Sequence, residues 1–491
     1  MTSAVMRGWI LMGATRCTRA GWSRNFIVRV NVFEFRDSHR QSRKPSLPIH
    51  RYSSYSYGQR NMTKDELIQQ IQRLEEELAS YKRKTENKTP NPDSLSPKRK
   101  KRKQRVFDFT KYNTRHIALK FLYLGWDYQG FASQENTDKT IEACMFEALL
   151  KTRLIEDRQS ANYSRCGRTD KGVSAFGQVI SLDVRTNLLE GVGVKVRPDG
   201  TAADRPGDKT TELNYVKMLN SVLPEEIRIL AWTPVDHEFN ARYSAASRTY
   251  KYFFPQADLD VEAMKTGLQK LVGLHDYRNF CKMDVANGVI NFVRRIISAD
   301  IKDLDTRGDG YRMYELTIQG MSFLYHQIRC IVAVLFLIGQ HKEKPEIIDE
   351  LLDVDKHPCK PQYSIASELP LVLYDTHFEG ITWIYDHDDQ EVNIKHLQKR
   401  WTSETIKSLM VGRMLDGLNS APFALRTNVE NKTFTTWEKV HPPILLQNAA
   451  LTMGSKSRQY KPLLSRPVCD SLEGRIEHFS KKRKLNDPQE S

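Results

Sequence analysis

The densest group of chemically capable side chains lies between Arg165 and Ser174, with the sequence Arg-Cys-Gly-Arg-Thr-Asp-Lys-Gly-Val-Ser. Two glycines bracket Arg168 and Asp170, and glycine permits a positive φ and close approach of another backbone. A guanidinium two residues from a carboxylate can meet it across such a turn and favour its ionised form. An ionised carboxylate among bases suits a nucleophile or base that acts on an anionic substrate. A surface turn with a weak ion pair has the same pattern.

Two further groups place cations beside aromatic rings or on one helix face. Residues 248–252 read Arg-Thr-Tyr-Lys-Tyr, and in RNA-binding proteins such rings stack on bases while the cations meet phosphates. A strand that buries alternate rings in a core has the same pattern. In the predicted helix at 322–339, His326 and Arg329 are three residues apart and share a face. There they could bind a phosphate or brace a loop.

Several classes of protein are excluded by what the sequence lacks. There is no Walker loop, dinucleotide fingerprint or nucleophile elbow, so a nucleotide cofactor is not indicated. The seven cysteines include no Cys-x-x-Cys pair, which excludes a disulfide scaffold and the common zinc spacings. The longest apolar run, residues 331–338, is far shorter than the ~20 residues that span a bilayer.

The run from Cys166 to Gln178 closely resembles the active-site loop of TruA-type tRNA pseudouridine synthases. The resemblance extends to residues 128–135, 239–252, 323–339 and 370–373, and so covers residues 112–380. Gly167, Phe176 and the stretch Lys282–Phe292 resemble the eukaryotic branch that modifies tRNA positions 38 and 39. A related branch with other targets has alanine at the place of Gly167.

The resemblance implies a role for each of five side chains. Asp170 would be the catalytic carboxylate that lets the uracil glycosidic bond break, so that the base can turn and rejoin through carbon. Whether it attacks the sugar or abstracts a sugar proton is left open. Arg168 would hold Asp170 and help displace the flipped nucleotide, and Tyr250 would stack on the uracil. Arg329 would lie under the site and pair with Asp170, while Leu371 would pack against the base. An isomerisation of this kind needs no cofactor and no metal.

Hydrophobic periodicity predicts the strands and helices that must position these residues. Alternation predicts strands at 117–123, 179–184, 227–232, 248–254, 289–301 and 312–319, and helical spacing predicts helices at 141–149, 213–223, 261–272 and 322–339. We therefore expect an α+β fold of two packed α/β halves, with mostly antiparallel sheets and a central RNA-binding cleft. The halves are residues 112–240, with a flexible insertion at 190–211, and residues 241–380. Residues 381–491 form a C-terminal extension with short helical stretches and a basic tail.

The N-terminal arm carries the net charge of +15. Residues 1–105 hold 24 basic and 9 acidic residues, whereas the remainder holds 51 of each. Residues 1–61 have the composition of a mitochondrial transit segment, but a disordered tail, or an extension preceding an alternative start at Met62, fits equally. The heptad spacing within 63–84 predicts a coiled-coil helix, or an amphipathic helix on its own domain. The basic linker at 85–111 and residues 481–484 resemble nuclear localisation signals.

The family resemblance implies site-specific pseudouridylation of the tRNA anticodon stem-loop, and together with the heptad segment it suggests a homodimer. We expect the protein in the nucleus and cytoplasm, with mitochondrial targeting if residues 1–61 act as a transit segment. The alternatives are a related synthase with other tRNA, snRNA or mRNA targets, and a non-catalytic tRNA-binding factor. A hydrolase with paired carboxylates is disfavoured, because Asp170 has only Asp183 as a sequence-near acidic partner.

Overall fold

The computed structural model describes residues 107–420, apart from 199 and 305–310, together with residues 76, 423–424, 437–438, 447–453 and 459–486. The expected disordered arm at 1–61 and most of the linker at 85–111 lie outside these residues. Of the expected coiled-coil helix at 63–84, only Glu76 is described, and it is helical and exposed. None of the described helices is long and apolar enough to cross a membrane.

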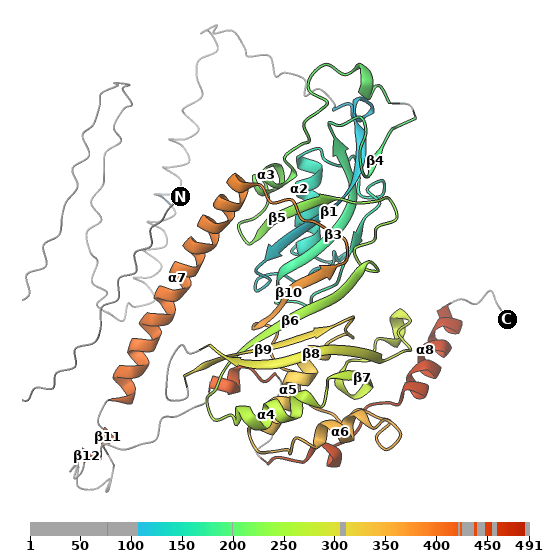
Figure 1. Ribbon diagram of the computed structural model, residues 1–491. Coiled ribbons are helices and arrows are strands. Elements are labelled where there is room, and N and C mark those ends of the chain that lie inside the picture. Colours follow the sequence, from blue (N-terminus) through green and yellow to red (C-terminus); the bar gives the residue numbers. More distant parts are fainter. Residues whose placement is uncertain are drawn as a thin grey trace, which may run out of the picture. The chain divides into compact units, whose positions relative to one another are not determined.

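A single mixed sheet runs through both halves of the predicted catalytic region (Figure 1). Its strands are β1 (Asn113–Tyr123), β2 (Ser164–Arg165), β3 (Ser174–Thr186), β4 (Val194–Lys195), β5 (Ile227–Pro234), β6 (Ala245–Pro255), β7 (Gly273–Asp276), β8 (Val293–Asp303), β9 (Met313–Gly320) and β10 (Leu371–Phe378). The order is β4-β1-β3-β10-β6-β9-β8-β7, while β5 pairs with β1 and β2 with β3. The last strand, β10, runs parallel to β3 and antiparallel to β6, and so joins the two halves. The predicted α+β class with mostly antiparallel pairing is confirmed.

Helices occur in both halves. They are α2 (Ile141–Lys151), α3 (Tyr215–Asn220), α4 (Val261–Gln269), α5 (Gln327–Gly339), α6 (Ile347–Leu352), α7 (His387–Asn419) and α8 (Leu472–Asn486). Thr140 begins α2, because its hydroxyl accepts a hydrogen bond from the Ala143 amide. The apolar face of α2, including Met145 and Leu149, packs on residues of β1 such as Leu119. The N-terminal half therefore has its own hydrophobic core.

The core of the C-terminal half forms around α5, in which every residue but Leu337 is buried. Tyr252 and Phe254 of β6 pack edge-on against Phe336 of α5, and Figure 1 shows α4, α5 and α6 gathered beside strands β6 to β9. The helix expected to begin near 322 begins instead at Gln327. The reason is that the preceding residue, His326, has a left-handed φ of 63°, which a right-handed helix does not contain.

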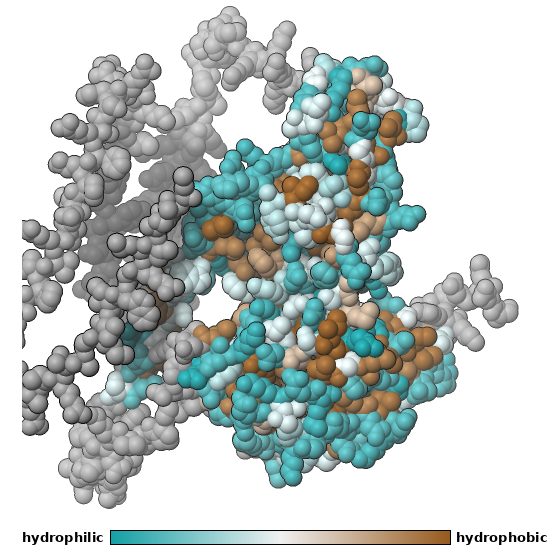
Figure 2. All heavy atoms as spheres, in the orientation of Figure 1, coloured by the Kyte–Doolittle hydropathy of each residue, from teal (hydrophilic) through white to brown (hydrophobic). Residues whose placement is uncertain are grey.

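The expected insertion at 190–211 contributes the short strand β4, which pairs with residues 114–115 of β1. Within it, the Arg205 guanidinium lies over the ring of Tyr112, 4.7 Å from the centroid. The flexibility of the insertion at residues 190–211 stays a prediction. On the face shown in Figure 2, hydrophobic residues remain at the surface over the region of β7 and β8, where Leu274, Val293 and Ile297 are exposed.

The C-terminal extension contains a continuous helix of 33 residues, α7, where only short helical stretches were expected. Asp386 begins it, because its carboxylate accepts hydrogen bonds from the amides of residues 388 and 389. The helix was missed because apolar residues such as Trp401, Leu409 and Met414 are spread around it, and helical periodicity is then weak. Two short strands, β11 (Phe423–Ala424) and β12 (Trp437–Glu438), follow it.

Candidate active site

The loop that carries Asp170 is held against the segment 128–131. The Phe131 amide donates to the Thr169 carbonyl (3.1 Å), and the Gly172 amide donates to the Tyr128 carbonyl (3.2 Å). Gly130 permits this contact, because its φ is +103° and a Cβ there would lie 3.2 Å from the Thr169 carbonyl oxygen. Two neighbouring segments thus fix the backbone on both sides of Asp170.

Polar side chains hold the start of the same loop. The Gln178 side-chain amide donates to the Gly167 carbonyl (3.2 Å). The Arg248 guanidinium donates to the carbonyls of Cys166 (3.0 Å), Arg242 (2.7 Å) and Met321 (2.7 Å). Arg248, expected among the cations that meet phosphates, therefore joins three chain segments that surround the site.

Two bases from the start of α5 meet the Asp170 carboxylate. Oδ2 of Asp170 lies 3.3 Å from Nε2 of His326 and 3.6 Å from Nη1 of Arg329. Arg329 also pairs with Glu368 (2.6 Å) and donates through Nε to the Ala366 carbonyl (2.8 Å). Since the Arg329 side chain is only 7% exposed, these partners fix its guanidinium beneath Asp170.

Burial and the neighbouring charges act on the pKa of the Asp170 carboxyl group in opposite directions. Loss of water raises the pKa of Asp170, and the charges of Arg329 and Lys282 oppose that rise, whereas Glu368 adds to it. The Asp170 side chain is 22% exposed. The Asp170 carboxylate is therefore partly dehydrated, and the adjacent charges of Arg329 and Lys282 favour its ionised form.

His326 is neutral in this setting. Burial, together with the charges of Arg329 and Lys282, lowers its pKa to about 4. Its ring lies against that of Tyr325, with centroids 3.8 Å apart. The left-handed backbone of His326 costs free energy in a non-glycine residue, and it points this imidazole at Asp170 rather than along the helix.

The structure places the other expected site residues in different settings. Tyr250 packs against both hydrophobic cores and edge-on against Phe323 (5.2 Å), and burial raises its pKa, so the phenol stays protonated. Leu371 is buried where β10 begins. Arg168 is exposed, and the structure gives it no ion pair with Asp170 within the described residues. The ion pair predicted across the turn is therefore not formed, because Arg329 takes that place from a distant helix.

Glu368 and Lys282 belong to this charge cluster and were not predicted as site residues. His326 belongs to it as well, and its spacing from Arg329 had indicated a shared helix face that could bind a phosphate or brace a loop. Nothing in the sequence pattern singles out Glu368, since its contact with Arg329 arises only when the segment before β10 folds against α5. Within residues 107–486 as far as they are described, no three His, Cys, Asp or Glu side chains are grouped as metal ligands.

Comparison with known proteins shows the family to which this chain belongs. A family model described as tRNA pseudouridine synthase matches residues 268–379. The chain is 49% identical over 431 residues to the tRNA pseudouridine(38/39) synthase of Bos taurus, which covers 86% of this chain and 89% of the bovine protein. The chain belongs to the tRNA pseudouridine synthase family.

More distant relatives in this tRNA pseudouridine synthase family match less of the chain. It is 40% identical over 334 residues to the tRNA pseudouridine(38/39) synthase of Saccharomyces cerevisiae, covering 66% of this chain and 72% of the yeast protein. It is 31% identical over 273 residues to tRNA pseudouridine synthase A of Methanosarcina mazei, covering 55% of this chain and 88% of the archaeal protein. As a family member, the protein is an isomerase that acts on tRNA.

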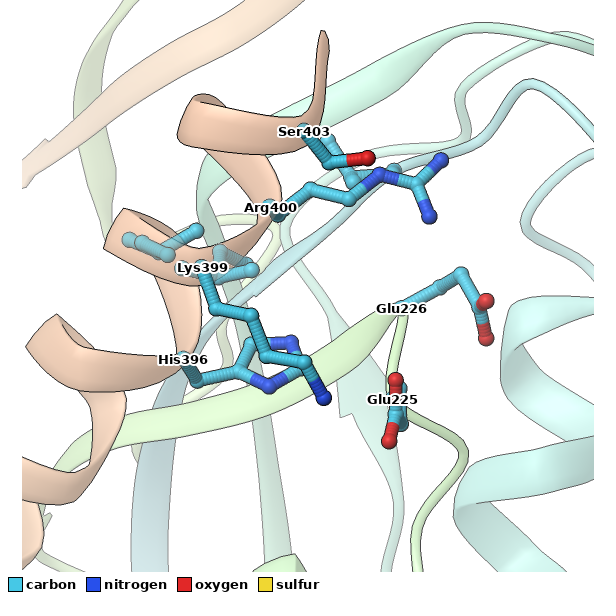
Figure 3. Close-up of a pocket in the computed structure, with 9 residues that line it drawn as sticks. Glu225, Glu226, His396, Lys399, Arg400 and Ser403 are labelled. Carbon is cyan, nitrogen blue, oxygen red and sulfur yellow. The ribbon is translucent and has the colours of Figure 1, made fainter. Parts of the chain in front are cut away.

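A separate cavity of about 150 Å³ lies between α7, the end of β1 and the turn that precedes β5 (Figure 3). Its bases, His396, Lys399 and Arg400, come from α7, and its acids, Glu225 and Glu226, come from the turn before β5. It shares no residue with the pseudouridine synthase site. It lies where α7 meets the N-terminal half of the sheet.

Proposed function

We propose that this protein isomerises uridine to pseudouridine at positions 38 and 39 of the tRNA anticodon stem-loop. The observation that carries the proposal is the partly dehydrated Asp170 carboxylate, which meets Arg329 and His326 in a member of the tRNA pseudouridine synthase family. The names of the bovine and yeast relatives support the two positions.

The chemistry requires one bond to break and another to form. The N1–C1′ glycosidic bond of uridine breaks, C5 bonds to C1′, and the C5 proton leaves while N1 gains a proton. Asp170 either attacks the sugar or removes a sugar proton, and in both routes it acts as the carboxylate. Arg329 holds that carboxylate, and Tyr250 offers a ring face to the extruded base.

The base must first leave its stack, at a cost of a few kcal/mol. Contacts between basic side chains and phosphates offset that cost. Arg168 and Lys171 are exposed on either side of Asp170 and suit such contacts. Leu371 would pack against the base once a small movement uncovers it, since it is buried in the free protein.

The substrate follows from the same assignment, whereas the dimer and the location are argued from the terminal segments. The substrate is tRNA, and the protein acts as a homodimer whose chains associate in part through the heptad segment 63–84. The basic runs near residues 98–103 and 481–484 support nuclear import, with function in the nucleus and cytoplasm. The Arg-rich segment 1–61 supports mitochondrial targeting as a second destination.

Position-resolved mapping of pseudouridine in a tRNA transcript tests the proposal. Purified protein should modify positions 38 and 39, and Asp170→Asn should abolish product while tRNA affinity changes by no more than a few-fold. Product at other positions only would favour a synthase with other targets. Tight binding without turnover by the unaltered protein would favour a non-catalytic tRNA-binding factor.

A further inference from the structure

Lys282 is an exposed lysine at the rim of the Asp170 charge cluster. Its amide donates to the Tyr325 carbonyl (3.0 Å), and its ammonium group lies over the Tyr325 ring, 5.5 Å from the centroid. That ring lies against the imidazole of His326, which in turn lies 3.3 Å from the Asp170 carboxylate. A continuous row of side chains therefore leads from the Asp170 carboxylate to this lysine.

Two further hydrogen bonds hold the backbone on either side of Lys282. The Lys360 ammonium group donates to the Cys281 carbonyl (3.0 Å). Arg475, from α8 of the C-terminal extension, donates to the Met283 carbonyl (3.2 Å). Cys281 and Met283 are themselves buried. The Lys282 side chain therefore projects from a fixed backbone, and a ligand that binds it does not have to order the chain.

Of the three bases in this cluster, Lys282 is the one that is both charged and exposed. Arg329 is buried and already contacts Asp170 and Glu368, and His326 is neutral because its pKa is about 4. Among the described residues, the structure gives the Lys282 ammonium group no carboxylate partner. Since a lysine ammonium group is a compact charge with three donors, it can take an anion from outside the protein.

We propose that Lys282 binds a phosphate next to the uridine that enters the site. The loop before β3 presents Arg168 and Lys171 from the N-terminal half, whereas Lys282 comes from the segment between β7 and β8 of the C-terminal half. An extruded nucleotide has one phosphate on each side of its ribose, so cations from both halves can hold it beside Asp170. The inference rests on the proposed function and adds a substrate-binding residue to that site.

The charge of Lys282 also favours the ionised form of Asp170. A lysine that served only this purpose would gain from burial beside the carboxylate, because water and salt weaken the interaction of exposed charges. Lys282 is instead exposed, and the rings of Tyr325 and His326 separate it from Asp170. A phosphate from the substrate is therefore the better partner for its ammonium group.

The test is a cycle of binding measurements with the full-length protein and synthetic tRNA anticodon stem-loops. Each stem-loop carries one uncharged methylphosphonate, on a 2′-O-methyl ribose, at one phosphate that flanks position 38 or 39. A 2′-O-methyl phosphodiester at the same place is its control. Lys282→Gln should raise the dissociation constant about tenfold and lower the salt-dependence slope by about 0.7–0.9. One methylphosphonate should weaken binding of the unaltered protein equally, and binding of Lys282→Gln hardly at all.

Two further variants serve as controls. Lys282→Arg keeps the positive charge and should bind within about threefold of the unaltered protein. Lys302→Gln is the matched control, because Lys302 is an exposed lysine of β8 that lies outside the charge cluster. It should leave the loss caused by each methylphosphonate unchanged.

Losses that simply add at every flanking phosphate would overturn the assignment, because groups in contact should not act independently. The same holds if Lys282→Gln binds with unchanged affinity and only moves the acid limb of the pH–rate profile, since the lysine would then act on Asp170 alone. Coupling without product at positions 38 and 39 would overturn the proposed reaction and leave the phosphate contact standing. A protein that does not bind the stem-loop overturns both.

Discussion

Replacement of Arg329 by glutamine should raise the pKa of Asp170 and move the acid side of the pH–rate profile to higher pH. In the proposed reaction, either chemical route needs the ionised carboxylate of Asp170, so the rate should fall as pH drops through its pKa. Burial already raises that pKa, and the Arg329 charge is the largest influence that opposes the rise. Glutamine keeps a hydrogen-bond donor near Ala366 but removes the charge.

The distance between the Asp170 carboxylate and the Arg329 guanidinium sets the size of the expected pKa shift. Unit charges 3.6 Å apart interact by about 5 kcal/mol at an effective dielectric constant of ~20. Two features reduce this figure, because Asp170 is partly open to water and Arg329 shares its charge with Glu368 at 2.6 Å. Opposite charges in such settings lower a carboxyl pKa by about 1–3 units. We expect the low end, so that at acidic pH the rate of Arg329→Gln falls about tenfold below that of the unaltered enzyme.

The assay is single-turnover release of tritium from C5 of uracil in a tRNA transcript, measured between pH 5 and 9. Single-turnover conditions keep product release out of the observed rate. Glu368→Gln is the matched control, since Glu368 raises the pKa of Asp170, and its removal should move the acid limb to lower pH. An acid limb that stays in place in Arg329→Gln, or that moves the same way in both variants, would refute the electrostatic account of the site.

Three further predictions follow from single contacts. Gly172→Ala should lower the free energy of unfolding by about 1–3 kcal/mol, because Gly172 has a φ of +79° and a Cβ there would lie 2.7 Å from Cγ of Glu368; Gly167→Ala, with no atom within 4 Å of its Cβ, should change it by less than about 0.5 kcal/mol in urea denaturation. His326→Ala should lower the rate without changing the shape of its pH profile above pH 6, since the pKa of His326 is about 4; an altered shape there would give His326 a proton-transfer role. Burial raises the pKa of Asp170, so its contribution to stability is lost as pH rises through that pKa; Asp170→Asn should therefore melt at a higher temperature than the unaltered protein at pH 8, and a lower melting temperature would contradict this.

Periodicity predicted the elements that position the site, because most of them alternate or repeat over a single buried face. The strand expected at 248–254 is β6, and the helix expected at 141–149 is α2. The helix of the C-terminal half was placed five residues too early, since no propensity rule anticipates a left-handed residue at His326. The long helix α7 was missed for the opposite reason, because its apolar residues do not confine themselves to one face.

The site itself was predictable only in part. Neighbours in sequence suggested that Arg168 pairs with Asp170, whereas the structure supplies Arg329 from a helix far along the chain. The resemblance to a known family placed Arg329 beside Asp170, and spacing alone did not. Contacts between distant segments, such as that of Glu368 with Arg329, depend on how β10 joins the halves. No local pattern carries that information.

The C-terminal extension, in which the sequence indicates only a basic tail that resembles a nuclear localisation signal, reaches back to the charge cluster. The Ser367 amide donates to the Leu451 carbonyl (2.7 Å), while the neighbouring Ala366 carbonyl accepts from Arg329 (2.8 Å). The segment that carries Glu368 is thus held on one side by the extension and on the other by the arginine. Glu368 and Arg329 act in opposite directions on the pKa of Asp170, so the position of that segment bears on the ionisation of the Asp170 carboxylate. The extension therefore belongs to the electrostatics of the site, although no residue of it needs to touch the substrate.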